Sequence, residues 1–296
     1  MQKTTTSNNT DSKTSFGYHD GKVETVISVD DVNRQAQQLA ETVSLEKISG
    51  LVRGEPFLKI ESLNAGYGKM EILHDFNLQV GKGQSLCMIG PNGAGKSTVL
   101  HSIFGFTRIF SGEIMSQVGE SHQSIAQMSS SQKLKVAGIS YILQDNSVFP
   151  DMTVEENLLM GAYLKGNMEE VRNSIERIFE KYDRLKVRRS KPARVLSGGE
   201  RRLLEISRAL VMEPSILLVD EPSIGLEPRF IDMVFEILDD LQRNEGKTIL
   251  MVEQNARQAL NIADIGFVLV TGQNRFTDKG YALLANNEVR KTFLGG

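Results

Sequence analysis

A run of closely spaced glycines separates an apolar stretch from a helix-compatible segment, and this junction restricts the fold more than any other part of the chain. The apolar stretch runs from Leu86 to Ile89, and the loop after it has the sequence Gly90-Pro91-Asn92-Gly93-Ala94-Gly95-Lys96-Ser97. Glycine lacks a Cβ, so backbone N–H groups in such a loop can approach an anion closely. A strand, such a loop and a helix in succession are typical of phosphate-binding α/β proteins. The sequence therefore predicts an α/β fold with a nucleotide phosphate site in this P-loop.

The side chains of the P-loop predict how ATP is held. Lys96 places a positive charge on the β- and γ-phosphates, and the Ser97 hydroxyl can ligate Mg²⁺. The helix that begins near Gly95 directs the positive end of its dipole at the same phosphates. The candidate ATP-binding residues of this segment are Gly90, Pro91, Asn92, Gly93, Ala94, Gly95, Lys96, Ser97 and Thr98.

Two adjacent carboxylates follow a second apolar strand, Ile216 to Val219. Asp220 ends this strand, where its carboxylate can orient Mg²⁺ through water. Glu221 points to the other side and can polarise the water that attacks the phosphate. The alternative is a pair of solvated carboxylates at a strand end, which the P-loop upstream disfavours.

A third motif, Leu196-Ser197-Gly198-Gly199-Glu200, opens a predicted helix near Gly199. Alone it predicts only a capped helix. In series with the two motifs above it resembles the signature sequence of ABC transporter ATPases, with glutamate where glutamine is commoner. The resemblance covers roughly residues 56–296. It implies that a second ATPase subunit, identical or paralogous, presents its own γ-phosphate to Ser197, Gly198, Gly199 and Glu200.

Further positions match the family pattern, with one exception. Tyr67 lies where the family places an aromatic ring that stacks on adenine, and Gln144 lies in a loop that touches Mg²⁺ and responds to the membrane subunit. Gln254 stands where the family usually has histidine, and a glutamine can hydrogen-bond a phosphate but cannot take a proton near pH 7. The resemblance therefore implies two catalytic residues, Glu221 and Gln254, and three residues that hold Mg²⁺, Ser97, Gln144 and Asp220.

Several segments favour one branch of the family. Four segments resemble the ATPases of branched-chain amino-acid uptake systems. They are Gly66-Tyr67-Gly68-Lys69, Met152 to Leu158, Val252 to Ala256 and Val289 to Gly295. The resemblance implies uptake of branched-chain amino acids or related small solutes through separate permease subunits, with a solute-binding protein acting indirectly. The signature, continued by Arg201-Arg202, is also similar to that of the lipopolysaccharide-export ATPase, so an exporter is the alternative. The transported solute is not encoded in this chain.

Two other readings of the family motifs carry less weight. A soluble ABC protein that acts on ribosomes or DNA usually has two cassettes or a long inserted coil, whereas this sequence has one P-loop and no long heptad run. A non-hydrolysing regulatory subunit would be expected to lack Glu221. The presence of Glu221 argues against that reading.

Composition excludes several classes of protein. The net charge of −3 provides no basic field for nucleic acid. The single cysteine, Cys87, lies in an apolar stretch and is expected to pack in the core. The four histidines show no metal-ligand spacing. With no apolar run of about 18 residues and no apolar leader, we expect a cytoplasmic chain, peripheral on the inner face of the cell membrane.

The order of the segments predicts an extension and one domain. Residues 1–55 form the expected N-terminal extension, polar at first and then patterned as an amphipathic helix over 28–43. Residues 56–296 form the expected ABC ATPase domain, with a mixed sheet, a small antiparallel β subdomain and an inserted helical subdomain at about 150–212. Residues 115–135 are expected to be a polar loop or weakly ordered insertion.

Overall fold

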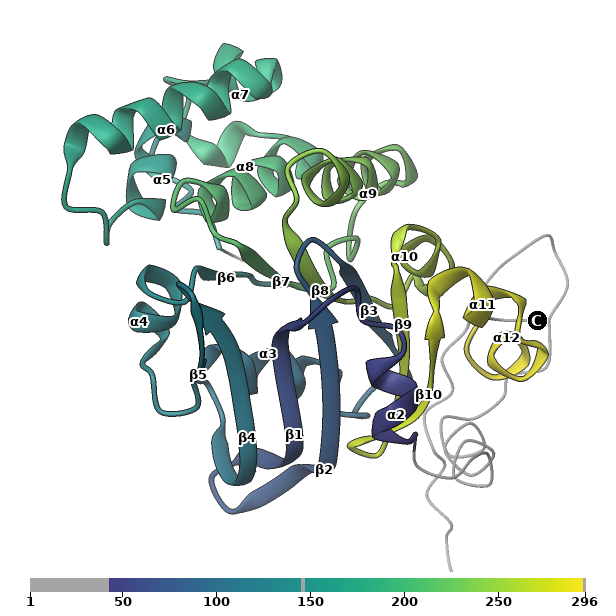
Figure 1. The fold of residues 1–296 in the computed structure, drawn as a ribbon. Helices are drawn as coiled ribbons and strands as arrows, with labels where there is room; N and C mark the ends of the chain where they lie inside the picture. The colour runs from purple at the N-terminus through teal and green to yellow at the C-terminus, as the bar shows by residue number, and fades with distance from the viewer. Residues whose placement is uncertain (1–42, 145–146, 295–296) are drawn as a thin grey trace, which may run out of the picture.

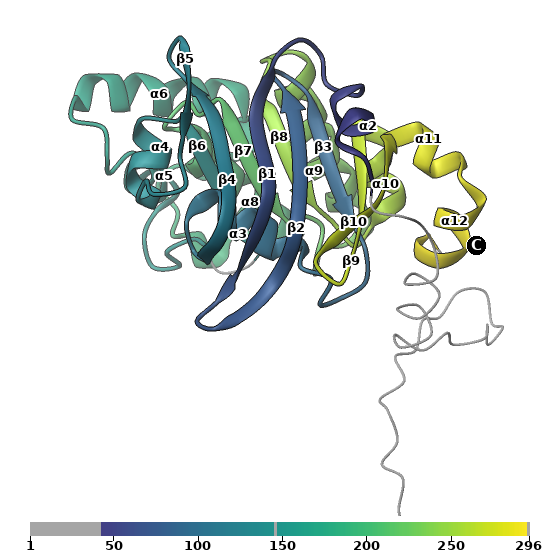
Figure 2. The same cartoon turned by 60° about the horizontal axis from the view of Figure 1, so that its bottom comes forward.

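The computed structural model describes residues 43–144 and 147–294, which contain two sheets of different kinds (Figures 1 and 2). The smaller sheet is antiparallel, with strand order β2-β1-β4-β5; its strands are β1 (Pro56–Tyr67), β2 (Met70–Gly81), β4 (Arg108–Val118) and β5 (Ser121–Ser124). The larger sheet has the order β10-β9-β3-β8-β7-β6; its strands are β3 (Ser85–Ile89), β6 (Ile139–Ile142), β7 (Ile216–Asp220), β8 (Thr248–Val252), β9 (Ile265–Val270) and β10 (Gln273–Lys279). Only β10 runs antiparallel to its neighbour in this sheet. The expected mixed α/β fold is confirmed.

Both faces of the larger sheet are buried, which is why its strands are apolar runs rather than alternating sequences. In β3, Leu86 belongs to a cluster shared with the smaller sheet, whereas Cys87 belongs to a cluster on the opposite face. Helix α3 (Lys96–Phe104) lies between the two sheets (Figure 1). The opposite face is covered by α9 (Pro228–Arg243), α10 (Ala256–Ile262), α11 (Gly280–Ala285) and α12 (Asn287–Phe293). Cys87 is a free, fully buried thiol, as expected from its sequence context.

A group of helices beside the larger sheet has a hydrophobic cluster of its own (Figure 1). Val171, Ile175 and Ile178 recur on one side of α6 and are buried there, the spacing of an amphipathic helix. The helices are α5 (Val154–Gly161), α6 (Met168–Lys181), α7 (Asp183–Val187), a 3₁₀ turn (Ala193–Val195) and α8 (Gly198–Leu210). All of them fall within the expected helical range of about 150–212. No helix in the described part of the chain is both long and apolar enough to cross a membrane.

The prediction of a polar loop at 115–135 is wrong. These residues continue β4, form the edge strand β5 and then form α4 (Ser130–Lys135). Strand β5 pairs with β4 through its backbone although all its side chains are exposed. Ser129 caps α4, because its hydroxyl accepts from the Gln132 N–H while the Gln132 side chain accepts from the Ser129 N–H. The serines that suggested a loop therefore mark the start of a helix.

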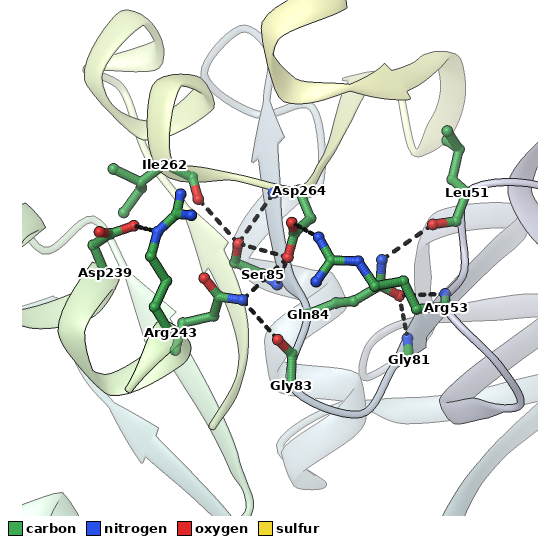
Figure 3. A network of polar contacts seen from close by, with 11 residues as sticks. Leu51, Arg53, Gly81, Gly83, Gln84, Ser85, Asp239, Arg243, Ile262 and Asp264 are labelled. Carbon is green, nitrogen blue, oxygen red and sulfur yellow. Dashed lines mark hydrogen bonds and ion pairs between the residues drawn. The ribbon is translucent and has the colours of Figure 1, made fainter. Parts of the chain in front are cut away.

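The packed unit begins before residue 56, at which we expected the ATPase domain to start. Helix α2 (Leu45–Ser49) packs on β2 and β10, and Ile48 is buried in the cluster between the sheets. The segment after α2 is bound by Gln84, which accepts from the N–H groups of Arg53 and Gly81 and donates to the carbonyl of Leu51 (Figure 3). Asp264 accepts from Arg53, Ser85 and Gln242 in the same network. The amphipathic pattern over 28–43 lies outside the described residues except for Val43.

Candidate active site

Three strands of the larger sheet end at the same edge, because β3, β7 and β8 run parallel. The P-loop follows β3, Asp220 ends β7 with Glu221 directly after it, and Gln254 follows β8. The carboxyl ends of parallel strands are the usual place for a ligand site in such sheets. The sheet therefore brings together three segments that are far apart in the sequence.

The P-loop has a backbone that only glycine adopts readily. Gly90, Gly93 and Gly95 all have positive φ angles, of 148°, 80° and 99°. A Cβ at Gly90 would also lie 2.1 Å from the carbonyl oxygen of Leu269. Glycine is thus needed here for two separate reasons, conformation and close approach to β9.

Lys96, the first residue of α3, closes the P-loop. Its Nζ donates to the carbonyls of Gly90 at 2.9 Å and Pro91 at 3.1 Å. Burial lowers the pKa of Lys96, while the charges of Glu221 and Asp220 act in the opposite direction. The ammonium group is therefore held at the loop, beside two carboxylates and the N-terminus of a helix.

Asp220 is almost completely buried and its two carboxylate oxygens have different donors. The Ser97 hydroxyl donates to Oδ1 at 3.0 Å, and the Tyr141 hydroxyl donates to Oδ2 at 2.8 Å. Burial raises the pKa of Tyr141, and the Asp220 charge and hydrogen bond raise it further, so that Tyr141 stays a donor. The contact between Ser97 and Asp220 joins the P-loop to the end of β7.

Glu221 has a strained backbone conformation, and two amide side chains hold its carboxylate. Its φ angle is 44°, in the left-handed region that non-glycine residues rarely adopt. Gln254 Nε2 lies 3.0 and 2.9 Å from the two carboxylate oxygens, and Gln144 Nε2 donates to Oε2 at 3.1 Å. Positive φ in a buried acidic residue is typical of functional sites, where the surrounding structure compensates the strain.

Glu253 holds the segments that carry Glu221 and Gln254 together. Its side chain, 2% exposed, accepts from the Ser223 hydroxyl at 2.8 Å and from the Gln254 N–H at 2.8 Å. It therefore ties the segment after Glu221 to the segment that carries Gln254. Glu253 belongs to none of the motifs that predict the site.

A cavity of about 380 Å³ opens among these residues. Its lining comprises Ile72, Asn92, Gly93, Gly95, Lys96, Ser97, Thr98, Gln144, Glu221 and Gln254. All of these except Ile72 are predicted site residues, so the structure brings most of the predicted ATP site together. Ile72 was missed because an isoleucine in an alternating strand carries no signal of a binding role.

Tyr67 lies at the end of β1 and does not line this cavity. Its ring is 42% exposed, and its hydroxyl contacts Nδ1 of His101 on α3. Burial lowers the pKa of His101, partly opposed by the charge of Asp220. The ring is exposed and therefore available for stacking, while its hydroxyl is joined to α3 through His101.

The signature residues begin α8 and are also absent from the lining of the cavity. Ser197 is the N-cap of this helix and forms a capping box with Glu200. Gly198 and Gly199 differ: a Cβ at Gly198 would meet only Leu226 at 3.7 Å, whereas one at Gly199 would lie 2.1 Å from the Phe230 ring. Gly199 is thus explained by packing within the chain, and Gly198 is not.

The oxygen atoms around Ser97 suit a hard cation such as Mg²⁺. The hydroxyl of Ser97, the carboxylate of Asp220 and the amide oxygen of Gln144 are ligand types that Mg²⁺ prefers. In residues 43–144 and 147–294, no cluster of three or more His, Cys, Asp or Glu side chains could hold a metal ion. These few oxygens match a cation that takes its remaining ligands from phosphate and water.

Comparisons with known proteins agree with this geometry. The family model described as ABC transporter matches residues 73–224. The branched-chain amino acid transport ATP-binding protein BraG of Pseudomonas aeruginosa is 41% identical over 239 residues, which cover 81% of this chain and 100% of the relative. The probable branched-chain amino acid transport ATP-binding protein LivF of Archaeoglobus fulgidus is 37% identical, covering 80% and 98%. The lipopolysaccharide export system ATP-binding protein LptB of Haemophilus influenzae is 29% identical, covering 80% and 97%.

Solved structures show the same fold. A nucleotide-free ATP-binding cassette from an ABC transporter superposes with a TM-score of 0.71 at 27% identity, covering 82% of this chain and 100% of that one. A cassette in its ADP conformation gives a TM-score of 0.70 at 27% identity, with the same coverage. The match of the family model, the identity to curated relatives and the shared fold lead to one conclusion: this chain belongs to the ABC transporter family.

Proposed function

We propose that this chain is the ATP-binding subunit of an ABC transporter and hydrolyses ATP to ADP and phosphate. The observation that carries the proposal is the cavity in which Lys96, Ser97, Gln144, Glu221 and Gln254 converge. Glycines of the P-loop surround the β- and γ-phosphates with N–H groups, and Lys96 turns from the loop carbonyls to the phosphate oxygens. Tyr67 stacks on the adenine ring.

Mg²⁺ would be held by Ser97 and Gln144, and Asp220 would orient it through water. When bound, it neutralises charge on the phosphates. Asp220 accepts the hydrogen bond that orients Ser97. The carboxylate therefore keeps the Ser97 hydroxyl at the edge of the cavity.

Glu221 orients and partly deprotonates the attacking water, and Gln254 positions it. Glu221 is the carboxylate that lines the cavity, and two amides fix its orientation. Gln254 has no ionisable group, so it acts only through hydrogen bonds. The two side chains are thus catalytic in different ways: one moves a proton and the other fixes geometry.

The transport context rests on the relatives. Those with identities of 41% and 37% are named for branched-chain amino acid transport, so we propose uptake of branched-chain amino acids or related small solutes. The chain would act with membrane permease subunits, a second ATPase subunit and, indirectly, a solute-binding protein, at the cytoplasmic face of the membrane. A lipopolysaccharide-type exporter is the alternative, supported by a 29% identical relative. We assign no nucleic-acid partner.

Phosphate release by purified chain, with its partner subunits present, tests the chemical assignment. Replacing a general base costs about 10²–10⁴-fold in rate, so Glu221→Gln should nearly abolish turnover and retain ATP binding. Loss of a neutral hydrogen bond costs on the order of 1–3 kcal/mol when its partner stays buried, so Gln254→Ala should leave measurable hydrolysis. Glu120→Gln, at an exposed position, is the matched control and should equal the wild type. An inactive Gln254→Ala beside an active Glu221→Gln would reverse the two roles.

A further inference from the structure

Tyr141 is a partly buried donor to the Mg²⁺-orienting carboxylate, and no motif assigns it a role. It lies on β6, in parallel register with Leu218 of β7. Its hydroxyl lies at the end of β7 and donates to Asp220 Oδ2 at 2.8 Å. The other oxygen, Oδ1, accepts from Ser97 at 3.0 Å. The two oxygens of one carboxylate are therefore divided between the P-loop helix and a neighbouring strand.

This division fixes the plane of the carboxylate. The last torsion of an aspartate side chain is broad, so a single hydrogen bond leaves the group free to turn. A Ser97 hydroxyl that ligated a cation would use an oxygen lone pair and could keep donating its proton to Oδ1, so this bond alone would still leave the Asp220 carboxylate free to turn. The Tyr141 bond to Oδ2 is independent of the cation. Oδ1 consequently stays directed at the Ser97 side of the cavity.

The Tyr141 hydroxyl is itself held by packing on three rings. The Tyr141 ring stacks on Phe104, with 5.5 Å between centroids and planes 26° apart. His101 and Phe106 meet it edge-on, at 5.7 and 5.9 Å. All three neighbours belong to α3 or the turn after it, the same element that carries Ser97. One helix thus positions both donors to Asp220.

We propose that Tyr141 is a positioning residue for the Mg²⁺ site: it orients Asp220 so that this carboxylate and Ser97 receive the cation together. The inference rests on the proposed ATPase function. Groups that orient metal ligands in this way typically change metal affinity about 10–100-fold when they are removed. Tyr141→Phe deletes only the hydroxyl and keeps the ring packed against Phe104.

The test compares nucleotide binding with and without the cation. A fluorescent ATP analogue is titrated into the full-length chain in excess Mg²⁺ and again in EDTA. For Tyr141→Phe we expect unchanged affinity in EDTA and a gain from Mg²⁺ that is about tenfold smaller than in the wild type. The Mg²⁺ concentration for half-maximal phosphate release should rise in parallel. Tyr281→Phe, which removes an exposed hydroxyl on α11, is the matched control and should change neither quantity.

A second variant shows whether the effect passes through Asp220. In an Asp220→Asn background, Tyr141→Phe should not reduce further the increase in nucleotide affinity that Mg²⁺ produces. The effects of two substitutions that act through the same group are not additive. If Mg²⁺ increases the nucleotide affinity of Tyr141→Phe as much as that of the wild type, the inference is overturned. An equal loss of affinity in Mg²⁺ and in EDTA also overturns it, because that result indicates a structural role only. Either result leaves the ATPase assignment in place. A wild-type chain that neither binds the analogue nor releases phosphate overturns the proposed function instead.

Discussion

Lys133 is the residue whose surroundings conflict most with its chemistry. Its side chain is fully buried, and Nζ has no hydrogen-bond partner among the residues that the structure describes. The amine lies beside Gly105, which ends α3, so the negative end of the helix dipole compensates part of its charge. Burial nevertheless lowers the pKa of Lys133 from 10.5 to about 8. The charged form is therefore costly in the folded state.

This shift predicts how stability changes with pH. Below pH 8 Lys133 is protonated in both states, and the folded protein carries the full cost of the buried charge. Between about pH 8 and 10.5 the unfolded state binds more protons than the folded state, so this group makes the free energy of unfolding rise with pH. Lys133→Met should stabilise the protein at pH 7, on the order of 1–3 kcal/mol, because one pKa unit corresponds to about 1.4 kcal/mol.

Urea unfolding of the wild type and the variant at several pH values between 7 and 10.5 measures this effect. The advantage of Lys133→Met should shrink as the pH rises. Lys135→Met, an exposed position on the same helix, is the control and should be nearly neutral throughout. A constant difference between wild type and Lys133→Met across this range would contradict the assigned pKa.

Residue types that are chemically specific could be predicted from the sequence, and packing partners could not. The glycines of the P-loop, Lys96 and Glu221 were predicted because few other residues suit those backbone angles or that chemistry. Tyr141 acts on Asp220 between two strands that are far apart in the sequence. Glu253 contacts Gln254 next to it, but its link to Ser223 is a tertiary contact that the sequence does not show. A tyrosine in an apolar strand or a glutamate before a glutamine has no local signature of that kind.

At the scale of elements, α8 joins the signature residues to both segments around the cavity. Arg202 on this helix is buried and pairs with Glu205 at 2.7 Å. It also donates to the carbonyls of Leu143, at 2.8 Å, and Pro222, at 3.1 Å. These carbonyls adjoin Gln144 and Glu221. The position of α8 is therefore linked to the two side chains that meet in the cavity.

Arg202→Met should destabilise the protein by about 3–5 kcal/mol, because breaking a buried ion pair leaves an uncompensated charge on Glu205. It should also lower phosphate release, since the carbonyls of Leu143 and Pro222 lose their donor. Arg201→Met, one residue earlier and exposed, should change stability by no more than about 0.5 kcal/mol. Differential scanning calorimetry and phosphate release measure the two effects. Equal melting temperatures for the two variants would show that the buried network contributes nothing.

Elements with a strong periodic pattern were predicted well, whereas those defined by pairing were not. Helix α9 starts with a proline and has one apolar face, and both features can be recognised in the sequence. The end of helix α5, in contrast, depends on tertiary packing, because Gly161 has no room for a Cβ against α8. Strand β5 has no apolar alternation at all, because it pairs at an exposed edge through its backbone. Its existence depends on β4, not on its own side chains.

At the scale of the whole molecule, the predicted ATP-binding residues form two groups, of which only one lines the cavity. The P-loop, Glu221 and Gln254 line one cavity, whereas Ser197, Gly198, Gly199 and Glu200 do not contribute to it. A Cβ at Gly198 would make only an ordinary contact with Leu226, so packing within the chain does not explain its identity. The N-terminus of α8 can bind an anion, as helix N-termini do. A second copy, or a paralogous subunit, would bring a phosphate to it.

The last prediction is that ATP drives this face-to-face pairing. Glu221→Gln should retain ATP, and light scattering should show a monomer without nucleotide and a dimer with ATP and Mg²⁺. Adding Gly198→Asp should abolish the dimer, because a carboxylate would meet the partner's phosphate. The same substitution should leave stability and ATP binding unchanged, since its Cβ meets only Leu226 at 3.7 Å and an acidic residue suits the first turn of a helix. A dimer that persists in the double variant would show that α8 does not face the nucleotide. If Glu221→Gln stays monomeric with ATP, titration with the candidate paralogous subunit decides between a heterodimer and no pairing at all.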